Sequence, residues 1–211
     1  MPELTILKDV LRTRDGNIFA LNVMQDFYFM NSPKFIFSIT NQSSHDSENG
    51  NKSRYAKMYL DAVKDGIPLI RKLKQGVSHN RSSQEHLELC KFYKGGKDYR
   101  HRYGVDVISR IFTMYAENGR IILKIEISKG EQKQTRNKSG QSVPGVVKPA
   151  GGSPIETVSY ALSEDAALNL AFMLEKEFAA WRCALNTDFL YYPKKYSYHP
   201  SAQPEAHDEE E

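Results

Sequence analysis

Alternation of apolar and polar residues marks most of the predicted strands. Phe35, Phe37 and Ile39 alternate with polar residues, which is typical of a half-buried strand. The same period of two returns at 55–60, 121–128 and 158–162, and strand character also extends over 18–30, 91–103 and 105–115. Residues 4–11 fit either a short helix or a strand. The chain is therefore expected to be rich in sheet.

Two helices are predicted, each directly after an alternating strand. Asp61 is placed to cap a helix that runs to about Lys74, and Ser163 is placed to cap a second one. The apolar residues of the second helix fall on one face: Ala167, Leu170, Ala171, Leu174, Phe178 and Trp181. Such a stripe predicts that the helix covers the core, or that it forms a seam between two copies of the chain.

Turn and loop signals separate these elements. Glu117-Asn118-Gly119 predicts a tight hairpin turn. The polar stretches 41–54 and 76–88 are expected to be a loop and a linker. Residues 129–154 are rich in Gly, Pro, Ser, Lys and Arg, which predicts a long flexible loop of positive charge.

The order of elements suggests a duplication. Residues 55–60 form an alternating strand before the capping residue Asp61, and residues 157–162 do the same before Ser163. We therefore expect an α+β fold of two related ββββα units, each a curved antiparallel sheet followed by one helix, in a pseudo-symmetric body. The expected division is a first unit at 1–75, a linker at 76–90, a second unit at 91–185, and an aromatic-basic segment with an acidic tail at 186–211. A coincidence within a generic α+β protein is the alternative.

Charge is distributed unevenly along the chain. The 211 residues carry a formal net charge of +3, yet residues 205–211 are almost all acidic. The remaining body is more basic than the total implies, and basic bodies attract polyanions. Cys90 and Cys183 have no metal spacing, so reduced thiols are expected, with a single disulfide as the alternative. No secretory signal and no apolar run of about 18 residues is evident, which favours a cytoplasmic protein with no membrane partner.

The sheet-plus-helix order resembles the whirly, PUR and transcription-coactivator class of single-strand binders, and is similar to phage-type single-stranded-DNA-binding proteins. The resemblance covers most of residues 16–182 at the level of element order. It implies paired units whose sheets present aromatic and basic residues to unpaired strands, and a homodimer through helix faces is a further possibility. It also implies that the acidic tail AHDEEE competes with DNA and recruits replication or recombination proteins. The tail lacks the terminal aromatic residue common in that class, which puts recruitment in doubt.

The densest mixture of aromatic and basic residues lies at 91–103, around Gly95-Gly96. Single-strand binders need cations that follow the phosphates and flat rings on which bases stack. The candidate binding residues are Lys91, Tyr93, Lys94, Lys97, Tyr99, Arg100, Arg102, Tyr103, Arg110, Lys124, Lys129, Lys133, Arg136 and Lys138. Further candidates are Tyr28, Lys34, Lys57, Tyr59 and Tyr115, with a second aromatic-basic run at 191–198. An edge strand with a solvated charged face and inward aromatics is the alternative interpretation.

Signatures of catalysis are missing from the sequence. There is no Gly-rich phosphate loop, paired-cysteine zinc signature or nucleophile elbow, and the six histidines are scattered. We therefore expect a non-enzymatic protein that binds single-stranded DNA, or RNA as a second choice, without cofactor or metal. The predicted role is sequence-nonspecific binding in DNA replication, recombination or repair. A metal-dependent nuclease, with Asp106 and Glu126 as its loose carboxylates, and a protein-interaction scaffold are the two alternatives.

Overall fold

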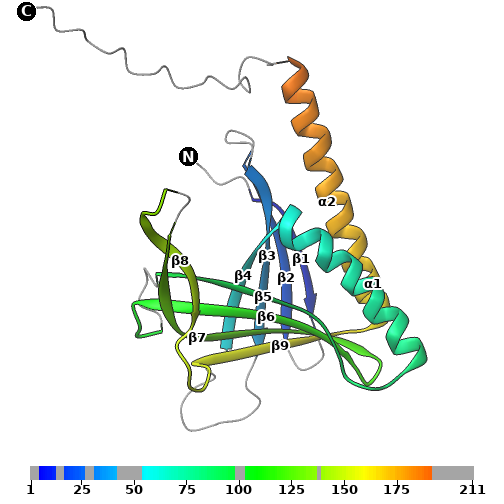
Figure 1. Ribbon diagram of the computed structural model, residues 1–211. Coiled ribbons are helices and arrows are strands. Elements are labelled where there is room, and N and C mark those ends of the chain that lie inside the picture. The colour runs from blue at the N-terminus through cyan, green and yellow to red at the C-terminus, as the bar shows by residue number, and fades with distance from the viewer. Residues whose placement is uncertain are drawn as a thin grey trace, which may run out of the picture.

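The computed structural model describes residues 5–12, 17–26, 31–41, 54–97, 103–136 and 139–191. It has an α+β architecture of two curled antiparallel sheets and two helices, as the sequence predicts (Figure 1). Most of the predicted loop at 41–54, and all residues after Tyr191, lie outside these ranges. Within the described part, no helix is both long enough and apolar enough to cross a bilayer.

The first sheet, sheet A, is a four-stranded meander. Its strands are β1 (Thr5–Arg12), β2 (Ile18–Asp26), β3 (Asn31–Asn41) and β4 (Arg54–Asp61), in the order β1-β2-β3-β4. The segment that fitted either a helix or a strand is therefore strand β1. The alternation in β3 and β4 places Phe35, Phe37 and Met58 on one fully buried face, as expected.

The second sheet, sheet B, has five strands. They are β5 (Leu87–Lys97), β6 (Val107–Glu117), β7 (Arg120–Arg136), β8 (Ser142–Pro149) and β9 (Glu156–Leu162). The order is β5-β6-β7, with β9 beside the first part of β7 and β8 beside its last part. The predicted hairpin turn is confirmed: Asn118 and Gly119 have φ values of 50° and 70° between β6 and β7. Two successive positive φ angles explain the Asn-Gly pair.

Both predicted helix caps are confirmed. Oδ1 of Asp61 accepts hydrogen bonds from the backbone N–H groups of Val63 and Lys64, at 3.0 and 2.9 Å. One π-helical turn, η1 (Ala62–Gly66), then leads into α1 (Ile67–Ser82). The Ser163 hydroxyl accepts from the N–H of Ala166 at the start of α2 (Glu164–Tyr191). Helix α1 runs past Lys74, so residues 76–82 of the expected linker are helical.

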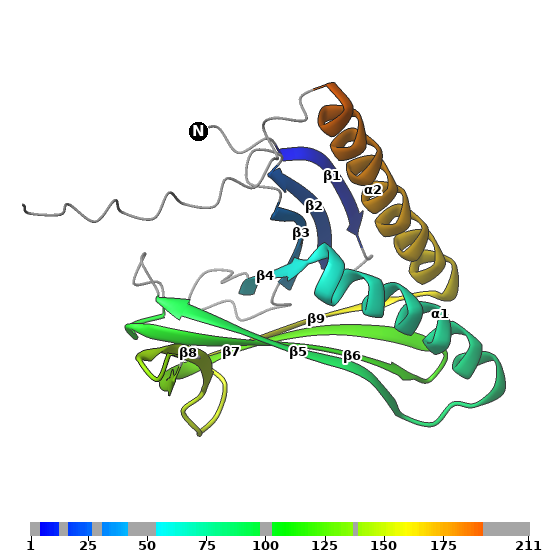
Figure 2. The same cartoon turned by 45° about the horizontal axis from the view of Figure 1, so that its top comes forward.

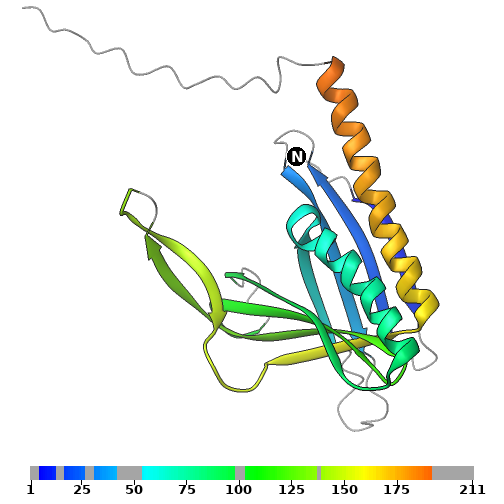
Figure 3. The same ribbon diagram turned by 45° about the vertical axis from the view of Figure 1, so that its right-hand side comes forward.

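One core joins both sheets and both helices. The rings of Phe37 in sheet A and Phe112 in sheet B meet at 5.5 Å between centroids. The predicted stripe of α2 faces this core: Ala167, Leu170, Ala171, Leu174 and Trp181 are buried, and Phe178 is half-buried. Figures 2 and 3 show α1 lying over sheet B with α2 beside it. The apolar stripe of α2 therefore covers the core of its own chain, the first of the two predicted alternatives.

Two ion pairs connect α1 to α2. Lys74 Nζ lies 2.6 Å from Glu175 Oε1, and Arg81 pairs with Glu164. The hydrogen bond from Arg81 and its positive charge lower the pKa of Glu164, and the same hydrogen bond raises the pKa of Arg81. Both pairs are exposed to solvent, so each contributes little to stability.

The prediction of a long flexible loop at 129–154 is wrong, because much of this segment forms paired strands. Strand β7 continues to Arg136 and pairs with β8, which forms a two-stranded ribbon. We call residues 130–149 the arm. Nearly all described side chains of the arm are exposed, so its strands lack the apolar alternation that marks a half-buried strand. The two strands of the arm are defined by their backbone hydrogen bonds. Backbone pairing leaves no pattern in the side chains, so a Gly- and Ser-rich sequence gives no sign of these strands.

Candidate nucleic-acid interface

Strand β4 lies across the strands of sheet B. At one end, the backbone N–H of Tyr55 donates to Glu156 Oε1 at 2.6 Å. At the other end, Asp65 of η1 holds Lys94 Nζ at 2.6 Å from its Oδ2. Lys94, Arg110, Ile127 and Glu156 are direct neighbours across β5, β6, β7 and β9. Strand β4 therefore lies against β9 and β7, and the following turn η1 reaches Lys94 of β5 at the other edge of the row.

On the inner face of sheet B, the face that packs on sheet A, basic side chains appear next to apolar ones at this row. On the core side of the row, Phe92 and Phe112 pack in the apolar interior. Two residues further along each strand, in the same facing direction, stand Lys94 and Arg110. On β7, the buried Ile127 is followed by the exposed Lys129. This row therefore brings Lys94, Arg110 and Lys129 to the inner face, which we call the floor, although Ile108, two residues beyond Arg110 on β6, is again buried in the apolar core.

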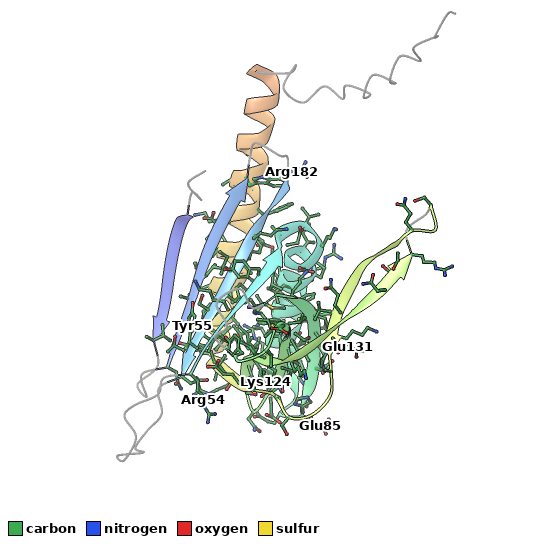
Figure 4. The ribbon with its side chains drawn as sticks, turned by 90° about the vertical axis from the view of Figure 1, so that its left-hand side faces the viewer. Arg54, Tyr55, Glu85, Lys124, Glu131 and Arg182 are labelled. Atoms are coloured by element: carbon green, nitrogen blue, oxygen red, sulfur yellow. The ribbon has the colours of Figure 1, made fainter. Side chains whose placement is uncertain are left out.

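The outer face of β4, the face that points away from the core, adjoins these basic residues and forms the wall of the site. Its burial pattern alternates, with Ala56, Met58 and Leu60 buried and Tyr55, Lys57 and Tyr59 facing outward. Tyr59 is 43% exposed, and Lys57 Nζ lies 5.8 Å from the centroid of the Tyr55 ring. Figure 4 looks onto this side of sheet A, with Arg54 and Tyr55 at the lower end of β4. We call Tyr55, Lys57, Tyr59, Arg110 and Lys129 the corner surface.

Two acidic groups near the corner surface, Asp61 and Asp65, are paired with lysines. Asp61 Oδ2 holds Lys34 Nζ at 2.9 Å, and Asp65 holds Lys94. Asp65 Oδ2 also accepts the backbone N–H of Asp61 at 2.8 Å, which links the two pairs. Within the described residues, Lys57, Arg110 and Lys129 form no ion pair. Glu156, whose Oε1 accepts the N–H of Tyr55, and the exposed Glu131 are the acidic residues nearest to these three cations in the sheet.

A second group of predicted residues lies on the opposite, outer face of sheet B. Tyr93 is 46% exposed, and Lys91 Nζ lies 5.8 Å from its ring centroid. Lys124 points to the same face but pairs with Glu126 at 3.2 Å, and Tyr115 packs on His86. The outer-face pair of Lys91 and Tyr93 thus resembles Lys57 and Tyr59 in composition and exposure.

The remaining predicted residues are spread over other places. Tyr103 is half-buried against the core, and Arg136 is exposed on the arm. Lys97 belongs to β5 and Lys133 to β7. Outside the described residues lie Tyr28, Tyr99, Arg100, Arg102, Lys138 and all but Tyr191 of the run at 191–198. The structure thus brings Lys94, Arg110 and Lys129 together on one face, and Lys91, Tyr93 and Lys124 on the other.

Tyr55 was missed as a candidate by the sequence analysis. It alternates with Lys57 and Tyr59, so its outward direction could have been read from the period of two. What the pattern does not contain is the contact of β4 with sheet B, because Tyr55 and Glu156 are 101 residues apart. The wall and the floor of the corner surface come from distant parts of the chain.

Metal chemistry has no evident site in this part of the chain. The described residues include no group of three or more His, Cys, Asp or Glu side chains that could hold a metal ion.

Comparisons of the chain with protein-family models and with curated proteins, and of its fold with solved structures, find no significant match.

Proposed function

We propose that the corner surface binds single-stranded nucleic acid, DNA in preference to RNA, as a passive binder without cofactor. One observation carries this proposal. Three cations that form no ion pair among the described residues, Lys57, Arg110 and Lys129, lie on the outer face of β4 and on the adjoining face of sheet B. Cations neutralise phosphates, and exposed tyrosine rings stack on bases whatever the sequence.

The spacing of the wall residues suits an extended strand. Tyr55 and Tyr59 are four residues apart on β4, which corresponds to roughly 13 Å along a strand. Lys57 lies between them on the same face. Two stacking rings with a cation between them favour bases and phosphates that alternate along β4. Each stacked base contributes about 1 to 3 kcal/mol.

The element order agrees with the resemblance to single-strand binders. Strand β4 leads into η1 and α1, and β9 leads directly into α2. We propose on this basis that the chain contains two related sheet-helix units, the second enlarged by the arm. In the resembled class, sheets of such units present their surfaces to unpaired strands.

Two double variants test the location of the site. Lys57→Ala/Tyr59→Ala and Lys91→Ala/Tyr93→Ala each remove one lysine and one exposed tyrosine from one strand. Fluorescence titration with an oligo(dT) at low salt is expected to show about 10- to 100-fold weaker binding for the β4 variant, from the loss of one stack and one phosphate contact. The β5 variant should stay within about twofold of the wild type.

The opposite ranking would move the site to the outer face of sheet B. Equal binding by all three proteins would exclude both surfaces, and absent binding would favour a protein-interaction scaffold. Arg110→Gln should lower the slope of log K against log salt by about 0.7, since one phosphate contact is lost from a single strand. Incubation of a labelled strand with Mg²⁺ or Mn²⁺ tests the nuclease alternative, because a passive binder leaves the strand intact.

A further inference from the structure

The wall of the corner surface continues from β4 onto the neighbouring strand β3. Ser38 of β3 is the direct ladder partner of Lys57, and Ala20 of β2 is the direct partner of Ser38 on its other side. Phe37 and Ile39, which flank Ser38 in the sequence, are fully buried in the core, so the Ser38 side chain points to the outer face. Directly opposed residues of an antiparallel pair have Cβ atoms about 4.5 to 5.5 Å apart. Ser38 and Lys57 are therefore close enough to contact one bound group.

The hydroxyl of Ser38 is buried although it belongs to an outer face. The residue is 7% exposed, and its Oγ has no hydrogen-bond partner among the described residues. Such a hydroxyl lowers stability, because it gives up hydrogen bonds to water and gains none in return. Alanine, the residue at the neighbouring position 20, would avoid this cost. Ser38 thus offers a polar group to a partner that the described part of the chain does not supply.

The position of Ser38 in the sheet indicates what this partner is. The ladder step that joins Ser38 to Lys57 lies between the step that ends in Tyr55 and the step that ends in Tyr59. Bases stacked on the two tyrosine rings are linked by a backbone that must pass between the rings. A phosphate of that backbone brings negatively charged oxygens, which accept hydrogen bonds, to the Ser38–Lys57 step.

Sheet B carries the same pair of residue types on its outer face, but there the lysine is neutralised. Lys124 of β7 and Ser159 of β9 are direct ladder partners. Lys124 Nζ lies 3.2 Å from Glu126 Oε2, and Ser159 is exposed to solvent. Lys57, in contrast, forms no ion pair within the described residues. Of these two pairs, only that of sheet A combines an unneutralised cation with a buried hydroxyl in need of an acceptor.

We propose that Ser38 and Lys57 form a phosphate subsite of the corner surface, in which one phosphate of the bound strand lies over the β3–β4 ladder between the two rings of the wall. This inference rests on the proposed function. Lys57, whose Nζ lies 5.8 Å from the centroid of the Tyr55 ring in the protein alone, turns to the phosphate and opens the way to Ser38. The Ser38 hydroxyl then donates to one phosphate oxygen, and the Lys57 ammonium group donates to another. Hydrogen bonds to a charged acceptor are about twice as strong as those between neutral groups.

Ser38→Ala tests the subsite, because stability and binding should change in opposite directions. Removal of an unsatisfied buried hydroxyl should raise the thermal midpoint of the protein alone by about 2 to 4 °C. Fluorescence titration with oligo(dT) at low salt should show roughly tenfold weaker binding, since a hydrogen bond to a charged oxygen is lost. The slope of log K against log salt should stay the same, because no charge is removed, whereas Lys57→Ala should lower it by about 0.7.

Ser109→Ala is the matched control. Ser109 has the other buried serine hydroxyl without a partner among the described residues, and it lies on the face of sheet B opposite to Arg110. Its replacement should also raise the thermal midpoint, while oligo(dT) binding stays within about twofold of the wild type.

The outcomes separate the subsite from the proposed function. Unchanged binding by Ser38→Ala, together with weaker binding by Lys57→Ala/Tyr59→Ala, would overturn the subsite and keep the corner surface. Equal losses of binding in Ser38→Ala and Ser109→Ala would also overturn the subsite, because the effect would then not depend on position. A lower thermal midpoint of Ser38→Ala would show that the hydroxyl has a partner within the chain, which removes the basis of the subsite. Absence of wild-type binding at low salt would overturn the proposed function, and the subsite with it.

Discussion

The side-chain amide of Asn41 forms two hydrogen bonds with the backbone of Ser159. Asn41 Nδ2 donates to the Ser159 carbonyl at 2.7 Å, and the Ser159 N–H donates to Asn41 Oδ1 at 2.8 Å. Asn41 ends β3, whereas Ser159 lies in β9, an edge strand of sheet B. The amide imitates a neighbouring peptide group, so it pairs the open edge of β9 and attaches sheet A to sheet B.

Replacement of Asn41 should weaken this attachment. Asn41→Asp removes the donor and places a negative oxygen against the Ser159 carbonyl, so the free energy of unfolding should fall by about 1 to 3 kcal/mol. Urea denaturation measures the change. Asn169→Asp, the same substitution at an exposed position of α2, should alter stability by less than about 0.5 kcal/mol. Equal effects at the two positions would show that the Asn41 contact contributes nothing.

Asp65 couples stability to the charge of the corner surface. Asp65→Asn weakens the ion pair with Lys94. The Asp65 side chain is 12% exposed and that of Lys94 is 37% exposed, so the free energy of unfolding should fall by about 1 to 2 kcal/mol. Glu175→Gln breaks a pair of the same 2.6 Å length between side chains about half exposed. It should cost less than about 0.5 kcal/mol in the same thermal or urea unfolding assay.

The same Asp65 variant has an opposite effect on binding. Release of Lys94 adds a cation to the floor, so oligo(dT) should bind more tightly at low salt, with a steeper salt dependence. A stability loss without any gain in binding would place Lys94 outside the bound strand's path.

The two cysteines should differ in reactivity. Burial raises the pKa of the Cys90 thiol to about 12, whereas Cys183 is exposed. Since the thiolate is the reactive form, iodoacetamide at pH 8 should label Cys183 in the folded protein and spare Cys90. Addition of urea should make both react. Peptide mass spectrometry assigns the labels, and rapid labelling of Cys90 without urea would contradict the burial of this thiol.

Deletion of residues 204–211 should strengthen binding at low salt by several-fold, if the acidic residues compete with phosphates for the same cations. The difference should shrink as salt rises, because added ions screen the competition. A chain of full length with Gln or Asn in place of the five acidic residues of 205–211 separates charge from length. Binding no tighter than the wild type in either protein would remove the tail from the mechanism.

Local patterns predicted much of this fold and less of its surface. Alternation gave the inward faces of β3, β4 and β7, and Asp61 and Ser163 cap helices as expected, since these signals act over a few residues. Tyr93 and Lys94 are adjacent in sequence and entered one candidate set, yet a period of two sends them to opposite faces of β5. The placement of β4 beside the basic residues of sheet B depends on where β4 crosses this sheet. That crossing is fixed by contacts between residues more than 100 positions apart in the sequence. Local patterns of apolar and polar residues cannot predict such contacts.

The two ends of the arm meet. Gly130 pairs with Pro149, and the Lys129 carbonyl binds the N–H of Ala150. A segment whose entry and exit lie together behaves as an insertion in its host, so it can lengthen, shorten or disappear without rerouting the chain around it. Evolution and protein engineering can therefore retune the reach of this ribbon independently, while the body that carries it keeps its architecture.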